Sequence, residues 1–61
     1  RLWLERAAAQ GDADAQFNLG SFYRYGKSVA QDIATACLWY ERAAAQGDSD
    51  ARQALRELGR G

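Results

Sequence analysis

LWYERAAAQGDSD, from Leu38 to Asp50, occurs almost unchanged earlier in the chain as LWLERAAAQGDAD, from Leu2 to Asp14. The two copies begin 36 residues apart, and 12 of the first 15 aligned positions are identical. Self-similarity at a fixed period of about 20–50 residues is typical of stacked repeat proteins. The duplication therefore predicts an array of short, similar structural units.

The QGDxD sequence in both copies predicts a tight joint between two helices. Alanine-rich residues that favour helix precede it. Gly11 and Gly47 supply the left-handed residue that commonly ends a helix, and Asp12 and Asp48 are good N-caps for the next one. A second aspartate two residues later adds negative charge at the positive helix N-terminus. The chain is therefore expected to turn sharply at both joints.

The alanine-rich, glycine-free sequence predicts a helix over residues 1–10. Apolar spacings of three and four residues predict helices over residues 13–25, 32–46 and 49–58. Gly20, inside the second helix, costs about 1 kcal/mol relative to Ala, which indicates that another helix approaches closely there. Gly26 is expected to end that helix, before a loop in which Val29 acts as a hydrophobic staple. The predicted buried positions of the last three helices are Ala15, Leu19, Phe22, Tyr23, Ile33, Ala36, Trp39 or Tyr40, Ala43, Ala44, Ala51, Leu55 and Leu58.

Composition limits the classes of function. The chain has 61 residues, no histidine, and eight basic against eight acidic residues. The absence of histidine removes the commonest metal ligand and general base, and the zero formal charge argues against a nucleic-acid partner. No apolar run approaches the roughly 20 residues of a membrane span. The chain begins inside a repeat, so we interpret it as a piece of a longer protein, and its compartment stays unassigned.

Three features that could carry chemistry have simpler structural interpretations. Cys37, the only cysteine, has no histidine to activate it, so we interpret it as a filler of the core or its boundary. The D-x-D pairs lack a complete calcium loop, and helix capping explains both of them. Trp3 and Trp39 could stack on a ligand, but their fixed place in the repeat favours packing between helices. No catalytic residue, metal site or cofactor is predicted.

The order A-x-x-x-L-G-x-x-Y-x-x-G, then V-x-x-D-x-x-x-A, then W-Y-x-[KR]-A-A-x-Q-G resembles the Sel-one-like repeat, a relative of the tetratricopeptide repeat. The loop departs from this pattern because Ser28 stands where the family usually has a second glycine. In the first copy Leu4 replaces the tyrosine, which loses the hydroxyl. The matching residues are Ala15, Leu19, Gly20, Tyr23, Gly26, Val29, Asp32, Ala36, Trp39, Tyr40, Arg42, Ala43, Ala44, Gln46 and Gly47.

The resemblance implies an all-α fold, a right-handed α/α superhelix (solenoid) of antiparallel helix pairs that is tetratricopeptide-like. Residues 1–11 would be helix B of a truncated repeat, and residues 12–47 one complete repeat of 36 residues. Residues 48–61 would be helix A of a last or capping repeat, because Arg56 replaces the close-contact Gly20. Terminal repeats are atypical since they must face water.

The resemblance also implies a protein–protein interaction scaffold that presents a concave helical groove to a peptide or protein, with no enzymatic activity. Phe17 is either an exposed anchor for a bound peptide or packed on a neighbouring repeat. Alternatives are a purely structural spacer and, less favoured, a secreted member that binds or hydrolyses β-lactams. The partner-binding residues implied on the concave face are Asp14, Phe17, Asn18, Ser21 and Arg24.

An exposed apolar face is expected at the N-terminal end, where Leu2 and Leu4 would belong to a helix B without its own helix A. Such a patch favours contact with another molecule. Self-association through this face is therefore a further hypothesis.

Overall fold

The computed structural model describes residues 2–26 and 31–59 of the 61-residue chain. These residues form four helices and no strand: α1 (Leu2–Ala9), α2 (Ala13–Tyr25), α3 (Ile33–Ala45) and α4 (Ser49–Glu57). The all-helical prediction is confirmed, with helix bounds within about two residues of those expected. The predicted staple at Val29 and the departure at Ser28 lie outside the described residues.

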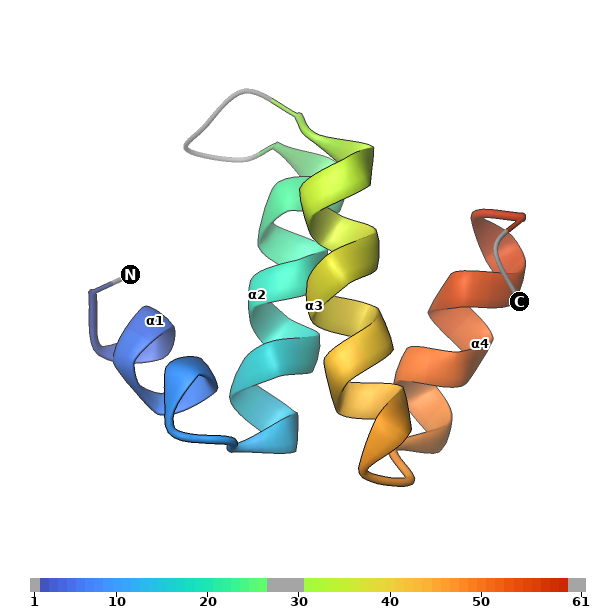
Figure 1. Cartoon of the computed structure of the whole chain (residues 1–61). Helices are drawn as coiled ribbons and strands as arrows, with labels where there is room; N and C mark the ends of the chain where they lie inside the picture. The colour runs from blue at the N-terminus through green and yellow to red at the C-terminus, as the bar shows by residue number, and fades with distance from the viewer. Residues whose placement is uncertain (1, 27–30, 60–61) are drawn as a thin grey trace.

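The helices follow one another across the molecule in chain order (Figure 1). Each packs against the next, so that α2 lies between α1 and α3, and α3 lies between α2 and α4. The chain reverses direction between α2 and α3, which makes them an antiparallel pair (Figure 1). This serial packing of neighbouring helices is the arrangement expected from a repeated helix pair.

The two glycine–aspartate joints have the predicted geometry. Gly11 and Gly47 have φ angles of 96° and 93°, a region that residues with side chains rarely adopt. The carboxylate of Asp12 accepts a hydrogen bond of 3.2 Å from the backbone N–H of Ala15. At the start of α4, the carboxylate of Asp48 accepts an equivalent hydrogen bond of 3.2 Å from the backbone N–H of Ala51. The duplicated sequence therefore produces the same helix stop and start twice.

A close contact between α2 and α3 explains the glycine within α2. A Cβ atom on Gly20 would lie 2.8 Å from Cδ1 of Tyr40 and 3.1 Å from the carbonyl oxygen of Ala36. Tyr40 is fully buried, whereas Trp39 is only partly buried, against the apolar cluster of α1 and α2. Of the two aromatic candidates, Tyr40 is therefore the core residue of α3.

A buried glutamine ties the ends of three helices together. The side-chain amide of Gln16, in α2, donates a 3.0 Å hydrogen bond to the carbonyl oxygen of Ala8, in α1. Its own amide oxygen accepts a 2.9 Å hydrogen bond from Nε2 of Gln46, at the end of α3. Burial of this polar side chain is tolerated because both ends of its amide are paired.

The structure corrects the prediction that Trp3 packs between helices. Its side chain is 71% exposed, because α1 buries Ala8 against α2 while Trp3 lies on another side of the helix. Leu4 packs partly against the α1–α2 cluster, and the side chain of Leu2 is outside the described part. Trp3 therefore contributes apolar surface at this end of the molecule.

Candidate functional site

A hollow of about 210 Å³ lies between α2 and α4, with Tyr40 of α3 contributing to its lining. Four lining residues come from one side of α2 at spacings of one, three and four, which places them on one helical face. Four others come from the first to the last turn of α4. The lining residues are Phe17, Ser21, Arg24, Tyr25, Tyr40, Asp50, Gln53, Ala54 and Glu57.

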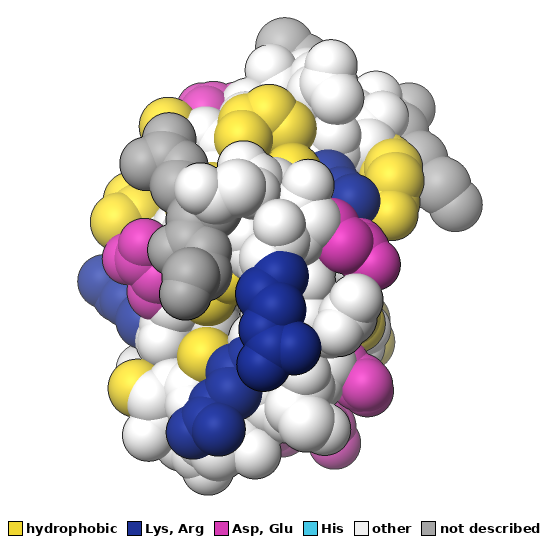
Figure 2. Space-filling model, turned by 90° about the vertical axis from the view of Figure 1, so that its right-hand side faces the viewer, with side chains coloured by type: hydrophobic (Ala, Val, Ile, Leu, Met, Phe, Trp, Pro, Cys, Tyr) yellow, Lys and Arg dark blue, Asp and Glu magenta, His cyan; other side chains and the backbone are white. Residues whose placement is uncertain are grey.

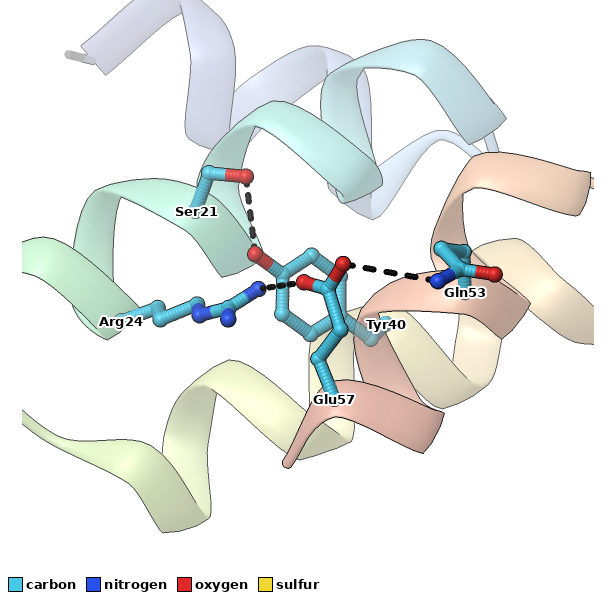
Figure 3. Close-up of polar contacts among 5 residues, drawn as sticks. All are labelled: Ser21, Arg24, Tyr40, Gln53 and Glu57. Carbon is cyan, nitrogen blue, oxygen red and sulfur yellow. Dashed lines mark hydrogen bonds and ion pairs between the residues drawn. The ribbon is translucent and has the colours of Figure 1, made fainter. Parts of the chain in front are cut away.

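Polar contacts connect the walls of this hollow (Figure 3). The hydroxyl oxygens of Ser21 and Tyr40 lie 2.8 Å apart, which joins α2 to α3. Nη1 of Arg24 donates to Oε1 of Glu57 at 3.0 Å, which joins α2 directly to α4. The other oxygen of Glu57 accepts a long hydrogen bond of 3.5 Å from Gln53. Residues distant in sequence thus meet in one polar network.

Arg24 is the cation of this network, and its side chain is largely buried. Partial burial of its guanidinium lowers the pKa of Arg24, but hydrogen bonds to Glu57 and Tyr40 outweigh that effect, so the pKa is raised overall. Its side chain is 18% exposed, against 48% for Glu57. The guanidinium also lies 5.1 Å from the ring centre of Tyr25, within the range of a cation–π contact. Arg24 is therefore held charged and in place.

A second hollow, of about 320 Å³, lies beside the first, between α2 and α1. Its lining residues are Leu4, Asn18, Ser21, Phe22 and Tyr25. Ser21 and Tyr25 line both hollows, so the two join across α2 into one surface, which we call the groove. The second hollow is the more apolar of the two, since Leu4 stands where Tyr40 stands one repeat later.

The structure brings together four of the five residues implied by the family resemblance. Phe17, Ser21 and Arg24 line the first hollow, and Asn18 and Ser21 line the second. Asp14 is exposed and lines neither hollow.

The packed alternative for Phe17 is supported in part, and its role as a peptide anchor stays a prediction. It is partly buried against the core, with its ring centre 5.5 Å from that of Tyr40, and it also lines the first hollow.

Sequence reasoning missed the residues that α3 and α4 contribute to the groove. Tyr40 was assigned to packing alone, yet its hydroxyl reaches Ser21 at the edge of the hollow. Glu57 and Gln53 are the repeat counterparts of Ser21 and Phe17, so the period of 36 residues was an available signal for both. The change from Leu4 to Tyr40 between two nearly identical segments was a second signal.

Other chemistry is not apparent in the described part of the chain. Cys37 is buried at 3% exposure, in the apolar cluster of α3 and α4. Residues 2–26 and 31–59 contain no group of three or more side chains arranged to hold a metal ion. None of the helices described is long and apolar enough to cross a membrane.

Comparison with known proteins identifies the repeat. The family model described as Sel1 repeat matches residues 1–12 and 13–48, and the second match contains all of α2 and α3. No curated protein and no solved structure shows a significant match to the chain.

Proposed function

The chain belongs to the Sel1 repeat family, and on this basis we propose that it is a protein-interaction scaffold whose groove binds an extended peptide or a helix of a partner protein. Sel1 repeats are generally protein-interaction modules, and the family is a non-catalytic repeat scaffold. This membership supports the proposal of a role without enzymatic activity.

One observation supports the choice of surface. Two hollows of about 210 and 320 Å³ share Ser21 and Tyr25, so the groove extends across α2 from α1 to α4. A surface that is hollowed over several helices can contact several side chains of one partner segment. Asn18 is exposed and Phe17 is partly buried, which places both polar and aromatic contacts on this surface.

A protein or peptide partner is favoured over a nucleic acid or a membrane. The eight basic residues are balanced by eight acidic ones. Three charged side chains line the first hollow, and two of them are acidic, whereas nucleic-acid sites need an excess of positive charge. Aromatic residues and arginine, here Phe17, Tyr25 and Arg24, are enriched in surfaces that contact other proteins.

Site-specific photo-crosslinking from the full-length protein in its source cells tests this proposal. A photoreactive residue at Asn18 should capture a protein partner, whereas the same residue at Glu41, exposed on α3 and outside both hollows, should capture little. Asn18→Lys should block binding without disturbing the core. Equal capture from both positions would favour a purely structural spacer.

We also propose that the helix pairs stack as a right-handed solenoid and that α4 is its capping helix. The side of α2 that faces α3 carries Phe17 and Gly20, and α4 has Gln53 and Arg56 at these positions. Arg52 and Arg56 are exposed and four residues apart, and basic side chains form an elongated stretch across this end of the molecule (Figure 2). Charged residues on the outer face are typical of terminal repeats.

Substituting the residues of α2 into α4 tests the capping role. Gln53→Phe combined with Arg56→Gly should make the outer face of α4 apolar and closely approachable. We expect this double variant to self-associate in sedimentation experiments while the parent chain does not associate through α4. An unchanged sedimentation profile would contradict the proposal.

A further inference from the structure

We propose that the first hollow, between α2 and α4, is a subsite for a basic side chain, lysine or arginine, of the peptide bound in the groove. This inference rests on the proposed function and specifies the chemistry of the ligand. The charges, the aromatic rings and the resident arginine of the hollow support it.

The acidic groups of the hollow exceed its basic ones. Arg24 is paired with Glu57 at 3.0 Å, which leaves Asp50 as the lining charge without a partner in the hollow. Asp50 is exposed, and within residues 2–26 and 31–59 its carboxylate forms no ion pair. Oε2 of Glu57 has only the 3.5 Å contact with Gln53. Two carboxylate groups therefore have acceptor positions available for a ligand's N–H donors.

The aromatic rings of the hollow suit the remainder of a basic side chain. Phe17 is partly buried and Tyr25 is 61% exposed, and both line the hollow with accessible ring surface. Lysine and arginine have long apolar stems that pack on such surfaces while the charged end remains near water. The faces of aromatic rings also attract cations. Rings beside carboxylates match both parts of the ligand side chain.

Arg24 already makes these contacts from within the protein. Its guanidinium lies against the Tyr25 ring at 5.1 Å and donates to Glu57. The same hollow thus stabilises one cation by an aromatic face and a carboxylate together. A ligand cation would pair with Asp50 and would compete with Arg24 for Glu57.

The second hollow sets a spacing for the ligand. Leu4 and Phe22 make it suitable for an apolar side chain. The two hollows lie on neighbouring sides of α2, since both are lined by Ser21 and Tyr25. Packed helices lie about 8–10 Å apart, and a polyproline II chain advances about 3.1 Å per residue with every third side chain on the same side. A basic and an apolar residue about three positions apart would therefore reach both hollows together.

Titration of the 61-residue chain with short, end-capped peptides tests this inference by NMR chemical shifts. The probes are TLTTKT and TKTTLT, which cover both chain directions, and the same peptides with Glu or Gln in place of Lys. We expect a lysine peptide to bind with a Kd of about 1 mM or lower. Its affinity should exceed that of the Gln peptide about fivefold to tenfold, and shifts should centre on residues of both hollows.

Matched variants separate the contributions of the charges. Asp50→Asn should remove the preference for lysine, whereas Asp14→Asn, its repeat counterpart outside both hollows, should keep it. Arg24→Gln should raise the affinity for the lysine peptide severalfold, because Glu57 is then free. Thermal unfolding of each variant verifies that it is folded.

Three results would overturn the inference. Tighter binding of the Glu peptide, lost in Arg24→Gln, would show that the subsite takes an anion; the groove would then still bind peptides. Equal binding of all three peptides would show that the hollow has no charge preference. Absence of binding at millimolar concentration would reject the subsite, while the crosslinking experiment at Asn18 would still decide the proposed function.

Discussion

Gly20 and Tyr40 fit each other so closely that a Cβ atom on the glycine would lie 2.8 Å from Cδ1 and 2.9 Å from Cε1 of the ring. Tyr40 has 0% exposure, and the backbone oxygen of Ala36 lies on the same side at 3.1 Å. The ring cannot move away without disturbing the core of α3 and α4. This contact fixes how α2 and α3 pack and, with them, the shape of the groove.

Gly20→Ala is therefore expected to destabilise the chain, although alanine is the better helix former. Helix propensity alone would stabilise it by about 1 kcal/mol, whereas overpacking a tight contact costs about 1–3 kcal/mol. We expect a net loss of up to about 2 kcal/mol in the free energy of unfolding, measured by urea denaturation. Arg56→Ala, at the matching exposed position of α4, should change it by less than about 0.5 kcal/mol. A stabilised Gly20→Ala variant would refute the packing argument.

The hydroxyl of Tyr40 is expected to contribute through its contact with Ser21, at 2.8 Å. Tyr40→Phe keeps the ring and removes one partner of this hydrogen bond, so the free energy of unfolding should fall by about 1 kcal/mol. Chemical denaturation followed by circular dichroism measures the change. Tyr25→Phe is the control, because Tyr25 is 61% exposed. Equal stability of the two variants would show that the Ser21–Tyr40 contact contributes nothing.

Gln16 is predicted to be a stabilising buried polar residue. Gln16→Leu replaces the amide with an apolar side chain and so removes the donor to Ala8 and the acceptor for Gln46. We expect a loss of about 1–2 kcal/mol in the free energy of unfolding. Arg52→Leu, at the repeat-equivalent exposed position, serves as the control. If Gln16→Leu were as stable as the parent chain, the hydrogen bonds would not compensate for burial of the amide.

Local features of this fold were predictable from sequence, and contacts between distant helices were not. The helix ends at Gly11 and Asp12 depend on neighbouring residues alone. The close approach of another helix at Gly20 was predictable because glycine is unfavourable inside a helix. The Arg24–Glu57 pair spans 33 positions and depends on how α2 and α4 meet. The prediction that Trp3 packs between helices was wrong. Its counterpart Trp39 is partly packed, whereas Trp3 itself is exposed.

Asp32, the N-cap of α3, is expected to make stability depend on pH. Its carboxylate accepts hydrogen bonds from the N–H of Thr35 at 3.1 Å and from Oγ1 of Thr35 at 2.8 Å. These bonds favour the ionised form and lower the pKa of Asp32 below 3.8 in the folded state. Its stabilising contribution is therefore complete above the unfolded pKa and is lost as pH falls through the lower folded value.

Asp32→Asn tests this dependence, because asparagine resembles the protonated acid in shape. The variant should melt at a lower temperature than the parent chain at pH 7, and the difference should be smaller in strong acid, where the carboxylate is protonated. Thr35→Val, which removes one of the two donors but keeps the backbone N–H, should lower the melting temperature at pH 7 and weaken its pH dependence. Melting temperatures that differ equally at pH 7 and in strong acid would show that the charge of Asp32 does not stabilise α3.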